Sequence, residues 1–402
     1  MDEQQKKLKV EELLTRGVEN VFPNVDFLRA LLMSDKKLTL YTGYDPTAPS
    51  LHLGNGLTML KLRQFQDLGH KVIMLIGDFT AMIGDPTDKS AARRKLTPEE
   101  VKVNWQNYKA QAAHILRFDG DNPVEVKFNS EWLAKLSFAD VVELASHFTV
   151  QRMMERDMFE KRWESGQPIY VHEFMYPLMQ GYDSVAMNVD GEIGGNDQTF
   201  NMLAGRHLMQ DFKQKEKFVL TIKLLADNTG KKMSKSEGNT IAMDDSPEDM
   251  FGKVMSWPDE MIINSFVLCT TIPMDEIKKM EQAMADGANP RDYKIKLAQA
   301  ITAAFLGAEA AAKGYEYFTT VFQSKELPDD IAEFVVDSEG VIEALLVSGA
   351  VATKSDARRQ IDQGGVKING EIVTDYEAKL PTGEDKILLQ KGKRFFAYIK
   401  QK

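Results

Sequence analysis

The chain has 402 residues and a formal net charge of −10 at pH 7, with 43% hydrophobic and 27% charged residues. This length allows two or three domains, and because no apolar run approaches the ~18 residues of a membrane span, we expect a globular chain without a membrane segment. The N-terminal stretch mixes both charge signs at helical spacing and has no apolar core, so we expect no secretory signal. The acidic balance argues against a protein that coats nucleic acid nonspecifically.

Side chains suited to metal binding or redox chemistry are sparse. Cys269 is the single cysteine, which excludes an internal disulfide and fits a reducing compartment such as the cytoplasm. The six scattered histidines and this cysteine show no zinc-ligand spacing, so no metal site of the protein's own is predicted. Any metal is expected to arrive with a substrate, as Mg²⁺ does with nucleotide phosphates.

The first half of the chain contains an expected strand, helix and strand. Residues 38–44 are rich in β-formers, residues 54–69 carry apolar positions at helical spacing, and residues 71–77 include a continuous apolar run. This order predicts a βαβ unit and an α/β fold with a parallel, Rossmann-like sheet. Ligands bind at the carboxyl ends of such strands, where residues 44–47 and 84–87 fall. The GxGxxG fingerprint is absent, which argues against a plain dehydrogenase.

The remaining elements divide the chain into three expected domains. Residues 97–165 look mostly helical, residues 218–222 form a strand, and residues 246–322 are helical again. A linker is expected at residues 327–330. Beyond it, two helices (341–346 and 354–363) precede short strands at 366–368 and within 386–399. The predicted domains are a Rossmann-like domain (1–245), a helical domain (246–328) and a small α+β domain (329–402).

Charge is unevenly placed along the chain. From Asp337 to Lys402 there are 11 Lys and Arg against 10 Asp and Glu, a balance of +1 that leaves −11 for the rest. Basic residues cluster in this tail, at Lys354, Arg358 and Arg359 and again between residues 391 and 402. A polyanion could dock there while the acidic remainder limits nonspecific contact.

Two segments far apart in the sequence together predict a triphosphate site. His52 lies in PSLHLGNG (residues 49–56) at the start of the expected helix, and KMSKSEGN begins 180 residues later at Lys232. A helix N-terminus with small residues can bind phosphate, and Lys232 and Lys235 can fold over leaving pyrophosphate. Alone, His52 would more often be a core histidine and the lysines a solvated turn. Together and in this order, they predict an ATP-using adenylation site.

These segments carry a resemblance to a known family. DPTAPSLHLGN and KMSKS resemble the two signatures of class I aminoacyl-tRNA synthetases, with Leu53 and Asn55 as variants of the first. The segments YTGYDPT (41–47), IGDP (83–86), YPLMQGYD (176–183) and IGGNDQ (193–198) narrow the likeness to bacterial tyrosyl-tRNA synthetases. Residues 340–400 resemble an S4-type RNA-binding domain, so the likeness covers essentially the whole chain.

The resemblance implies a tyrosine site. Tyr176, Gln180 and Asp183 are spaced i, i+4 and i+7, so a helix would place all three on one face. In the family, the residues matching Tyr176, Gln180 and Asp85 meet the α-amino group, and those matching Tyr41 and Asp183 bond the phenol hydroxyl. These residue types suit a charged amine, which needs acceptors, and a buried phenol, which needs both a donor and an acceptor.

The resemblance also implies an ATP site, with ATP and Mg²⁺ as substrate and no tightly bound cofactor. Thr47 and His52 are expected at the γ-phosphate, and Asp197 at the ribose. The other residues expected around the nucleotide and its phosphates are Asp45, Gly54, Asn55, Gly195, Lys232, Lys235, Lys89 and Arg93. Arg94 is an alternative to Arg93, and the stretch that holds both could also be an ordinary basic loop. Glu192 departs from the glutamine common in the family, and its role is open.

The implied activity is tyrosine activation by ATP followed by transfer to tRNA(Tyr), in a cytoplasmic homodimer. Lys354, Arg358 and Arg359, at i, i+4 and i+5, are the expected RNA-binding residues. Two alternatives remain at this stage. A tryptophanyl-type synthetase shares both signatures, although Tyr41 and Asp183 suit a hydroxyl better than an indole. A noncatalytic RNA-binding relative would keep the S4-like tail and lose the signatures, and here both are present.

Overall fold

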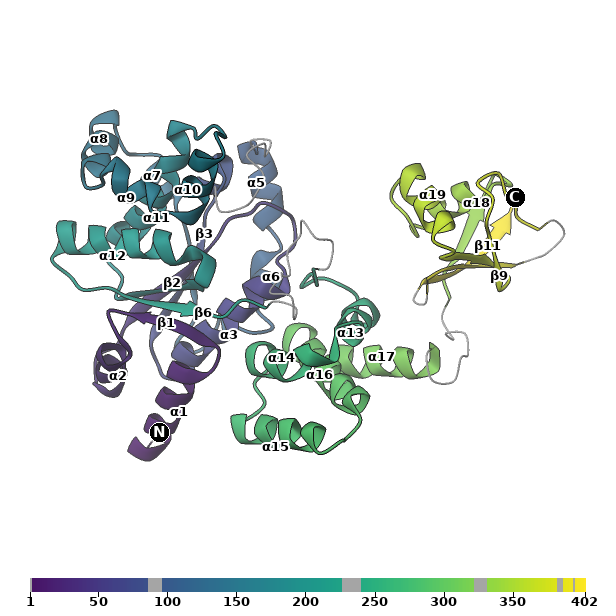
Figure 1. Cartoon of the computed structure of the whole chain (residues 1–402), viewed down its shortest axis with the longest axis horizontal. Coiled ribbons are helices and arrows are strands. Elements are labelled where there is room, and N and C mark those ends of the chain that lie inside the picture. The colour runs from purple at the N-terminus through teal and green to yellow at the C-terminus, as the bar shows by residue number, and fades with distance from the viewer. Residues whose placement is uncertain (1, 86–95, 226–239, 322–330, 382–385, 393–394) are drawn as a thin grey trace. The chain divides into compact units, whose positions relative to one another are not determined.

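A computed structural model of the chain describes residues 2–85, 96–225, 240–321, 331–381, 386–392 and 395–402 (Figure 1). The chain forms two compact units, one of Met1–Asp245 with Trp257–Gly307 and the other of Ser246–Ser256 with Ala308–Lys402. Within the described residues, no helix is long and apolar enough to cross a membrane. The expected boundary at residue 245 separates the two units, but the expected helical segment is shared between them. The three-domain division therefore stays a prediction.

The first unit is built on a six-stranded sheet in the order β1-β6-β5-β2-β3-β4. Neighbouring strands run parallel from β6 to β4, and only the edge strand β1 is antiparallel. This confirms the predicted Rossmann-like sheet. Three of its strands were not predicted, among them β4, which lies within a stretch expected to be helical. The strands are β1 (Val18–Phe22), β2 (Thr39–Tyr44), β3 (Lys71–Ile76), β4 (Glu125–Phe128), β5 (Gly191–Gly195) and β6 (Phe218–Ile222).

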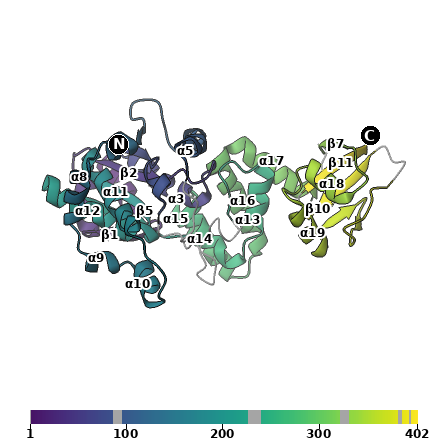
Figure 2. The same ribbon diagram turned by 90° about the horizontal axis from the view of Figure 1, so that it is seen from above.

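Helices cover both faces of this sheet. The predicted βαβ unit is β2, α3 (Leu53–Asp67) and β3, and Phe65 of α3 stacks on Phe218 of β6 at 5.9 Å. Lys217, the preceding residue, points to the other face, where α11 (Val171–Met187) and α12 (Thr199–Lys213) lie side by side (Figures 1 and 2). Strand order reverses between β2 and β5, so a ligand crevice is expected at their carboxyl ends.

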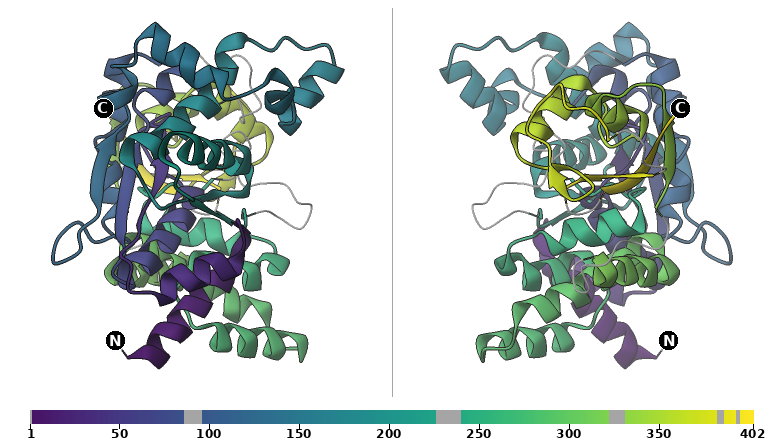
Figure 3. Two further views of the ribbon diagram at one scale, coloured as in Figure 1. Left: turned by 90° about the vertical axis from the view of Figure 1, so that its left-hand side faces the viewer. Right: turned by 90° about the vertical axis from the view of Figure 1, so that its right-hand side faces the viewer.

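The other helices complete the first unit. Figure 3 shows the N-terminal helix α1 beside the helical segment that holds α14, and Arg16 at its end donates to the carbonyls of Val267 and Ile272 at 2.9 and 2.7 Å. These helices are α1 (Glu3–Thr15), α2 (Val25–Met33), α4 (Thr80–Ile83), α5 (Pro98–Trp105), α6 (Tyr108–Ala112), α7 (Ser130–Leu133), α8 (Phe138–Ser146), α9 (Val150–Met154), α10 (Asp157–Glu164), η1 (Asn196–Gln198), η3 (Asp259–Met261), α14 (Ile262–Cys269), α15 (Met274–Ala285) and α16 (Pro290–Leu306).

The second unit joins two helices to a small α+β module. Helices α13 (Pro247–Met255) and α17 (Ala308–Thr319) pack through Phe251 and Phe318, whose rings are 5.3 Å apart. The module has helices α18 (Val341–Val347) and α19 (Lys354–Asp362) and a sheet in the order β7-β11-β10-β8-β9.

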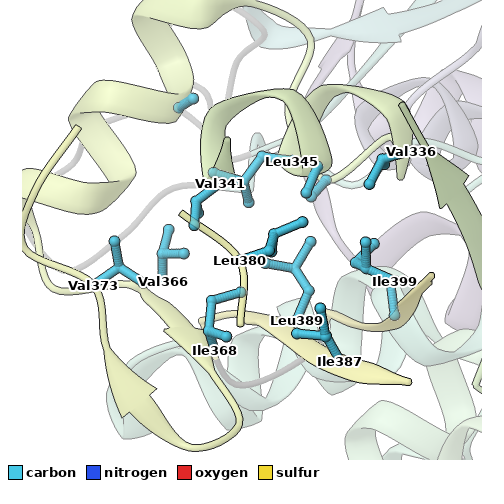
Figure 4. Close-up of a cluster of buried hydrophobic side chains, with 14 of the residues drawn as sticks. Val336, Val341, Leu345, Val366, Ile368, Val373, Leu380, Ile387, Leu389 and Ile399 are labelled. Carbon is cyan, nitrogen blue, oxygen red and sulfur yellow. The ribbon is translucent and has the colours of Figure 1, made fainter. Parts of the chain in front are cut away.

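The core of the module joins both of its helices to the sheet, and the helices and strands predicted beyond residue 340 are present. The strands are β7 (Glu333–Val336), β8 (Val366–Ile368), β9 (Glu371–Ile372), β10 (Ile387–Lys391) and β11 (Phe395–Gln401). Among the buried side chains are Leu345 of α18, Ile361 of α19 and Leu389 of β10, and Figure 4 draws most of this cluster. Because these residues pack on one another, the module has a hydrophobic core of its own.

Candidate functional site

A cavity of about 280 Å³ opens at the carboxyl ends of β2 and β5, where the strand order reverses. Such a switch point is where parallel sheets bind ligands. Tyr41 lies within β2 and Asp45 directly after it, while Gly195 ends β5. The residues predicted to bind tyrosine or ATP that line this single cavity are Tyr41, Asp45, Thr47, His52, Gly54, Asn55, Asp85, Tyr176, Gln180, Asp183, Gly195 and Asp197.

His52 is the N-cap of α3, which fixes both its ring and its tautomer. Its Nδ1 accepts the backbone N–H of Asn55 at 3.3 Å, and the Asn55 side-chain oxygen accepts the backbone N–H of His52 at 3.0 Å. Because Nδ1 accepts, the proton of the neutral ring is assigned to Nε2, which becomes a donor. Asn55, expected near the nucleotide, uses its side-chain oxygen to complete the capping box of α3.

Gly56 has a packing role that the sequence reasoning missed. It is one of the small residues at the helix start predicted to bind phosphate, yet it does not line the cavity. A Cβ at Gly56 would lie 2.1 Å from Cε1 of Phe305 in α16. The glycine therefore allows α3 and α16 to pack closely, while Gly54 borders the cavity.

The described chain just after the second signature pairs with the first signature through its backbone. Leu53 N donates to the carbonyl of Ile241 at 2.9 Å, and Met243 N donates to that of Leu51 at 2.9 Å. The chain after residue 239 therefore lies against the start of α3, and Thr240 and Ile241 line the cavity. Lys232 and Lys235, in residues 226–239, and Lys89 and Arg93, in residues 86–95, lie outside the described residues.

Helix α11 places Tyr176, Gln180 and Asp183 along the cavity, as their spacing allows. The Tyr176 hydroxyl donates to Asp45 Oδ2 at 2.8 Å, and Thr80 Oγ1 donates to Asp45 Oδ1 at 2.8 Å. Burial raises the pKa of Asp45 to about 7, although these two hydrogen bonds oppose the rise. Asp45 can therefore carry either charge state near neutral pH.

Asp45 should make folding stability pH-dependent. Because its folded pKa lies above the unfolded value near 3.9, its contribution is complete below about pH 4 and is lost as pH rises through 7. The loss reaches at most about 4 kcal/mol, and less in practice because Asp45 is only partly buried. Asp45→Asn removes this titration. Urea unfolding at pH 5 and pH 8 measures the free energy of unfolding of both proteins. Relative to the parent, the variant should be more stable at pH 8 than at pH 5, and a stability difference that does not change with pH would contradict the assignment.

Tyr41 and Asp183 lie at the inner end of the cavity and have internal partners. The Tyr41 hydroxyl is 3.0 Å from Ser184 Oγ, and Asp183 accepts from Trp132 Nε1 at 2.7 Å and from Asn129 Nδ2 at 3.3 Å. Burial raises the pKa of both Tyr41 and Asp183. This end of the cavity is closed by buried hydrogen-bonding groups and suits a ligand that ends in a hydroxyl.

Asp85 lies at another wall of the cavity, held by two donors. Arg156 Nη2 donates to its Oδ1 at 3.0 Å, and Gln198 Nε2 donates to its Oδ2 at 2.8 Å. These bonds fix the Asp85 carboxylate at the cavity that Tyr176 and Gln180 of α11 also line. The wall can therefore accept hydrogen bonds from a cation.

Comparison with known proteins agrees with this geometry. The family model for class I tRNA synthetases (W and Y) matches residues 33–323, and that for the S4 domain matches residues 342–386. Tyrosine–tRNA ligase of Moorella thermoacetica is 46% identical over 394 residues, 96% of this chain and 94% of that protein. The Thermotoga maritima enzyme of the same name is 45% identical over 392 residues, 96% of each chain. The chain belongs to the tyrosyl-tRNA synthetase family.

Solved structures of this family share the fold. A C-terminally truncated mitochondrial tyrosyl-tRNA synthetase of Aspergillus nidulans has a TM-score of 0.67 at 22% identity, covering 80% of this chain and 99% of its own. That of Archaeoglobus fulgidus, complexed with L-tyrosine, has a TM-score of 0.60 at 23% identity, covering 78% and 100%. Membership makes the chain an aminoacyl-tRNA synthetase of the tyrosine type, which settles the tryptophanyl and noncatalytic alternatives.

Several residues that shape the synthetase site were not singled out from the sequence. Trp132, Asn129 and Ser184 hold the inner end of the cavity, and Arg156 pairs with Asp85. Gln198 belonged to a segment that resembled the family, but no spacing pointed to the others. Asn129 and Trp132 come from the start of α7, Ser184 from α11 and Arg156 from the start of α10, so the fold brings these segments together.

The S4 module of the synthetase presents its predicted RNA-binding residues on α19. Lys354, Arg358 and Arg359 are all exposed. Arg359 pairs with Asp356 at 2.5 Å, and the Arg358 guanidinium lies 6.0 Å from the Tyr376 ring. The described C-terminal lysines also have partners: Lys400 pairs with Glu333 at 2.6 Å and Lys402 with Asp337 at 3.3 Å, so the basic tail is partly neutralised.

Proposed function

We propose that this synthetase condenses L-tyrosine with ATP into tyrosyl-adenylate and then transfers the tyrosyl group to the 3′-terminal ribose of tRNA(Tyr). The observation that carries the proposal is one cavity that joins the capped start of α3, the segment after the second signature, and the hydroxyl-suited inner end at Tyr41 and Asp183. In the first step, the tyrosine carboxylate oxygen bonds to the α-phosphorus while the bond to pyrophosphate breaks. No covalent enzyme intermediate is needed, because positioning and charge stabilisation suffice.

The tyrosine end of the cavity matches the substrate's polar groups. We assign the phenol hydroxyl to Tyr41 and Asp183, and the α-ammonium to Asp85, Tyr176 and Gln180. The Tyr176 hydroxyl donates to Asp45, so its oxygen is left as an acceptor toward the ammonium. The carboxylate of Asp85 supplies the compensating charge.

The phosphate end begins at α3. His52 and Gly54, at the start of α3, line the cavity and suit the γ-phosphate together with Thr47. We assign Asp197 to the ribose and Asp45, Gly54, Asn55 and Gly195 to the rest of the nucleotide. Lys232, Lys235, Lys89 and Arg93, known only from the sequence, complete the charge stabilisation of pyrophosphate with Mg²⁺ carried by ATP.

Replacing Tyr41 by phenylalanine tests the tyrosine assignment. A site built to bond a hydroxyl leaves buried polar groups unpaired when the hydroxyl is missing, a rule for which tyrosyl-tRNA synthetases are themselves the standard example. Tyr41→Phe should therefore narrow the ratio of kcat/KM for tyrosine over phenylalanine in pyrophosphate exchange. The matched control is Tyr108→Phe, which loses a buried bond to the Ala48 carbonyl but does not line the cavity. If both variants keep the parent ratio, Tyr41 does not contact the phenol.

We also propose that the protein is a homodimer that binds tRNA(Tyr). We place it in the cytoplasm, because aminoacyl-tRNA is consumed there by translation. Large apolar side chains lie exposed along helices α8 to α11, at Phe138, Val142, Val150, Trp163, Tyr170 and Val171. Exposed apolar groups of this kind favour a protein interface. A solution mass of one chain, 45.4 kDa, rather than two would contradict the dimer.

A further inference from the structure

Beside the tyrosine end of the cavity lies a buried ion pair that the reaction does not yet use. Lys217 is 0% exposed, and its ammonium pairs with Glu192 of β5, whose side chain is 2% exposed. Lys217 also donates to Ser184 Oγ at 2.7 Å and to the Met202 carbonyl at 3.3 Å. Its three N–H groups therefore all have acceptors.

A buried pair of this kind is weak evidence for stability, because desolvation offsets the attraction and apolar replacements of similar size are often neutral. The feature that points to a role in binding is the contact of Glu192 with Gln180 at the cavity. Glu192 lines the cavity, and its Oε1 accepts from Gln180 Nε2 at 3.0 Å. An ionised carboxylate can only accept, so it holds the NH₂ group of Gln180 toward itself and turns the amide oxygen away.

We propose that Glu192 is a positioning residue that fixes the Gln180 carboxamide with its oxygen toward the substrate α-ammonium, and that Lys217 is the counter-ion that holds the Glu192 carboxylate in place. The assignment rests on the proposed tyrosine site. A protonated carboxyl or an amide at position 192 could donate a hydrogen bond to the Gln180 oxygen. The Gln180 carboxamide could then flip and present its NH₂ group, in place of its oxygen, to the substrate ammonium. Besides Lys217, the titratable groups facing Glu192 are Asp183 and Tyr41, so Lys217 is the cation beside it among the described residues.

The test is the double variant Glu192→Gln/Lys217→Met, which removes both charges and leaves neither buried alone. Calorimetry would give the Kd of L-tyrosine and of 3-(4-hydroxyphenyl)propanoate, which lacks the amine. The Kd of the amine-free analogue divided by the Kd of L-tyrosine should fall about tenfold in the double variant. The reason is that the hydrogen bond from the charged α-ammonium to the Gln180 oxygen is lost. The double variant also loses the contact of Lys217 with Ser184, which lies at the phenol end of the cavity. Both ligands carry the phenol, so this loss should change their affinities equally.

A purely structural pair would give a different result. Lys61→Met is the matched control, because Lys61 is another buried lysine, bonded to the carbonyls of Leu13 and Arg16 at 2.8 Å and outside the cavity. It should change the melting temperature and leave the ratio alone. A folded double variant with the parent ratio would overturn the role of Glu192. If the parent itself binds tyrosine no better than the amine-free analogue, the proposed function fails as well.

Discussion

Replacing His52 or Thr47 by alanine should slow adenylate formation by roughly 10- to 1,000-fold, because a contact that stabilises charge in the transition state is lost. Both residues lie at the phosphate end of the cavity, where charge builds only as pyrophosphate leaves. The loss should therefore appear in kcat, while tyrosine affinity barely changes. Lys235→Ala, in the second signature, is expected to behave in the same way. Single-turnover adenylate formation is the measurement.

His52 also caps α3, so a second variant must separate catalysis from folding. His52→Ala removes the cap, which costs about 1 kcal/mol of stability. His52→Asn keeps a good N-cap acceptor and removes the Nε2 donor. This variant should be as stable as the parent and should still form the adenylate slowly. His114→Ala, an exposed histidine that does not line the cavity, is the control for general effects. A parental rate in His52→Asn would mean that His52 serves the helix alone.

The sequence predicted those parts of the site that depend on local pattern. The β2–α3–β3 unit followed from a switch between strand and helix periodicity. The two signatures predicted one shared triphosphate site, and the structure pairs residues 51–53 of the first with residues 241–243, just after the second. Strand β4 was missed because four half-buried residues are too short to show an alternation within a helical stretch. The antiparallel edge strand β1 is defined by its pairing with β6, which no local pattern encodes.

Long-range polar contacts account for the remaining gaps. Lys217 lies in a run of charged residues, Lys215-Glu216-Lys217, that looks like a solvated turn, yet it is fully buried against Glu192. Trp132 and Asn129 come from the loop and helix after β4 and bond Asp183 of α11, about fifty residues away in the chain. Such partners are set by packing of the sheet and its helices, so a single sequence gives no spacing from which to infer them.

Removing the S4 module should separate the two activities of the synthetase. The module has its own hydrophobic core, and the described residues that line the cavity all belong to the first unit, so a chain ending near Asp330 should still form tyrosyl-adenylate. It should charge tRNA poorly, because it lacks the exposed basic residues of α19. Pyrophosphate exchange and tRNA charging, measured on the same preparation, give the two readouts. Normal charging by the truncated chain would place the tRNA site elsewhere.

Within the module, the triple variant Lys354→Ala/Arg358→Ala/Arg359→Ala should weaken tRNA binding and flatten its salt dependence. Each lost phosphate contact removes up to about 0.7 to 0.9 from the slope of log affinity against log salt. Because Arg359 already pairs with Asp356, its share should be smaller than that of Lys354. The control variant Lys379→Ala/Lys386→Ala/Lys400→Ala changes net charge equally but removes lysines that pair with Glu339 and Glu333. Equal slopes in the two variants would show that net charge, and not the α19 surface, sets tRNA affinity.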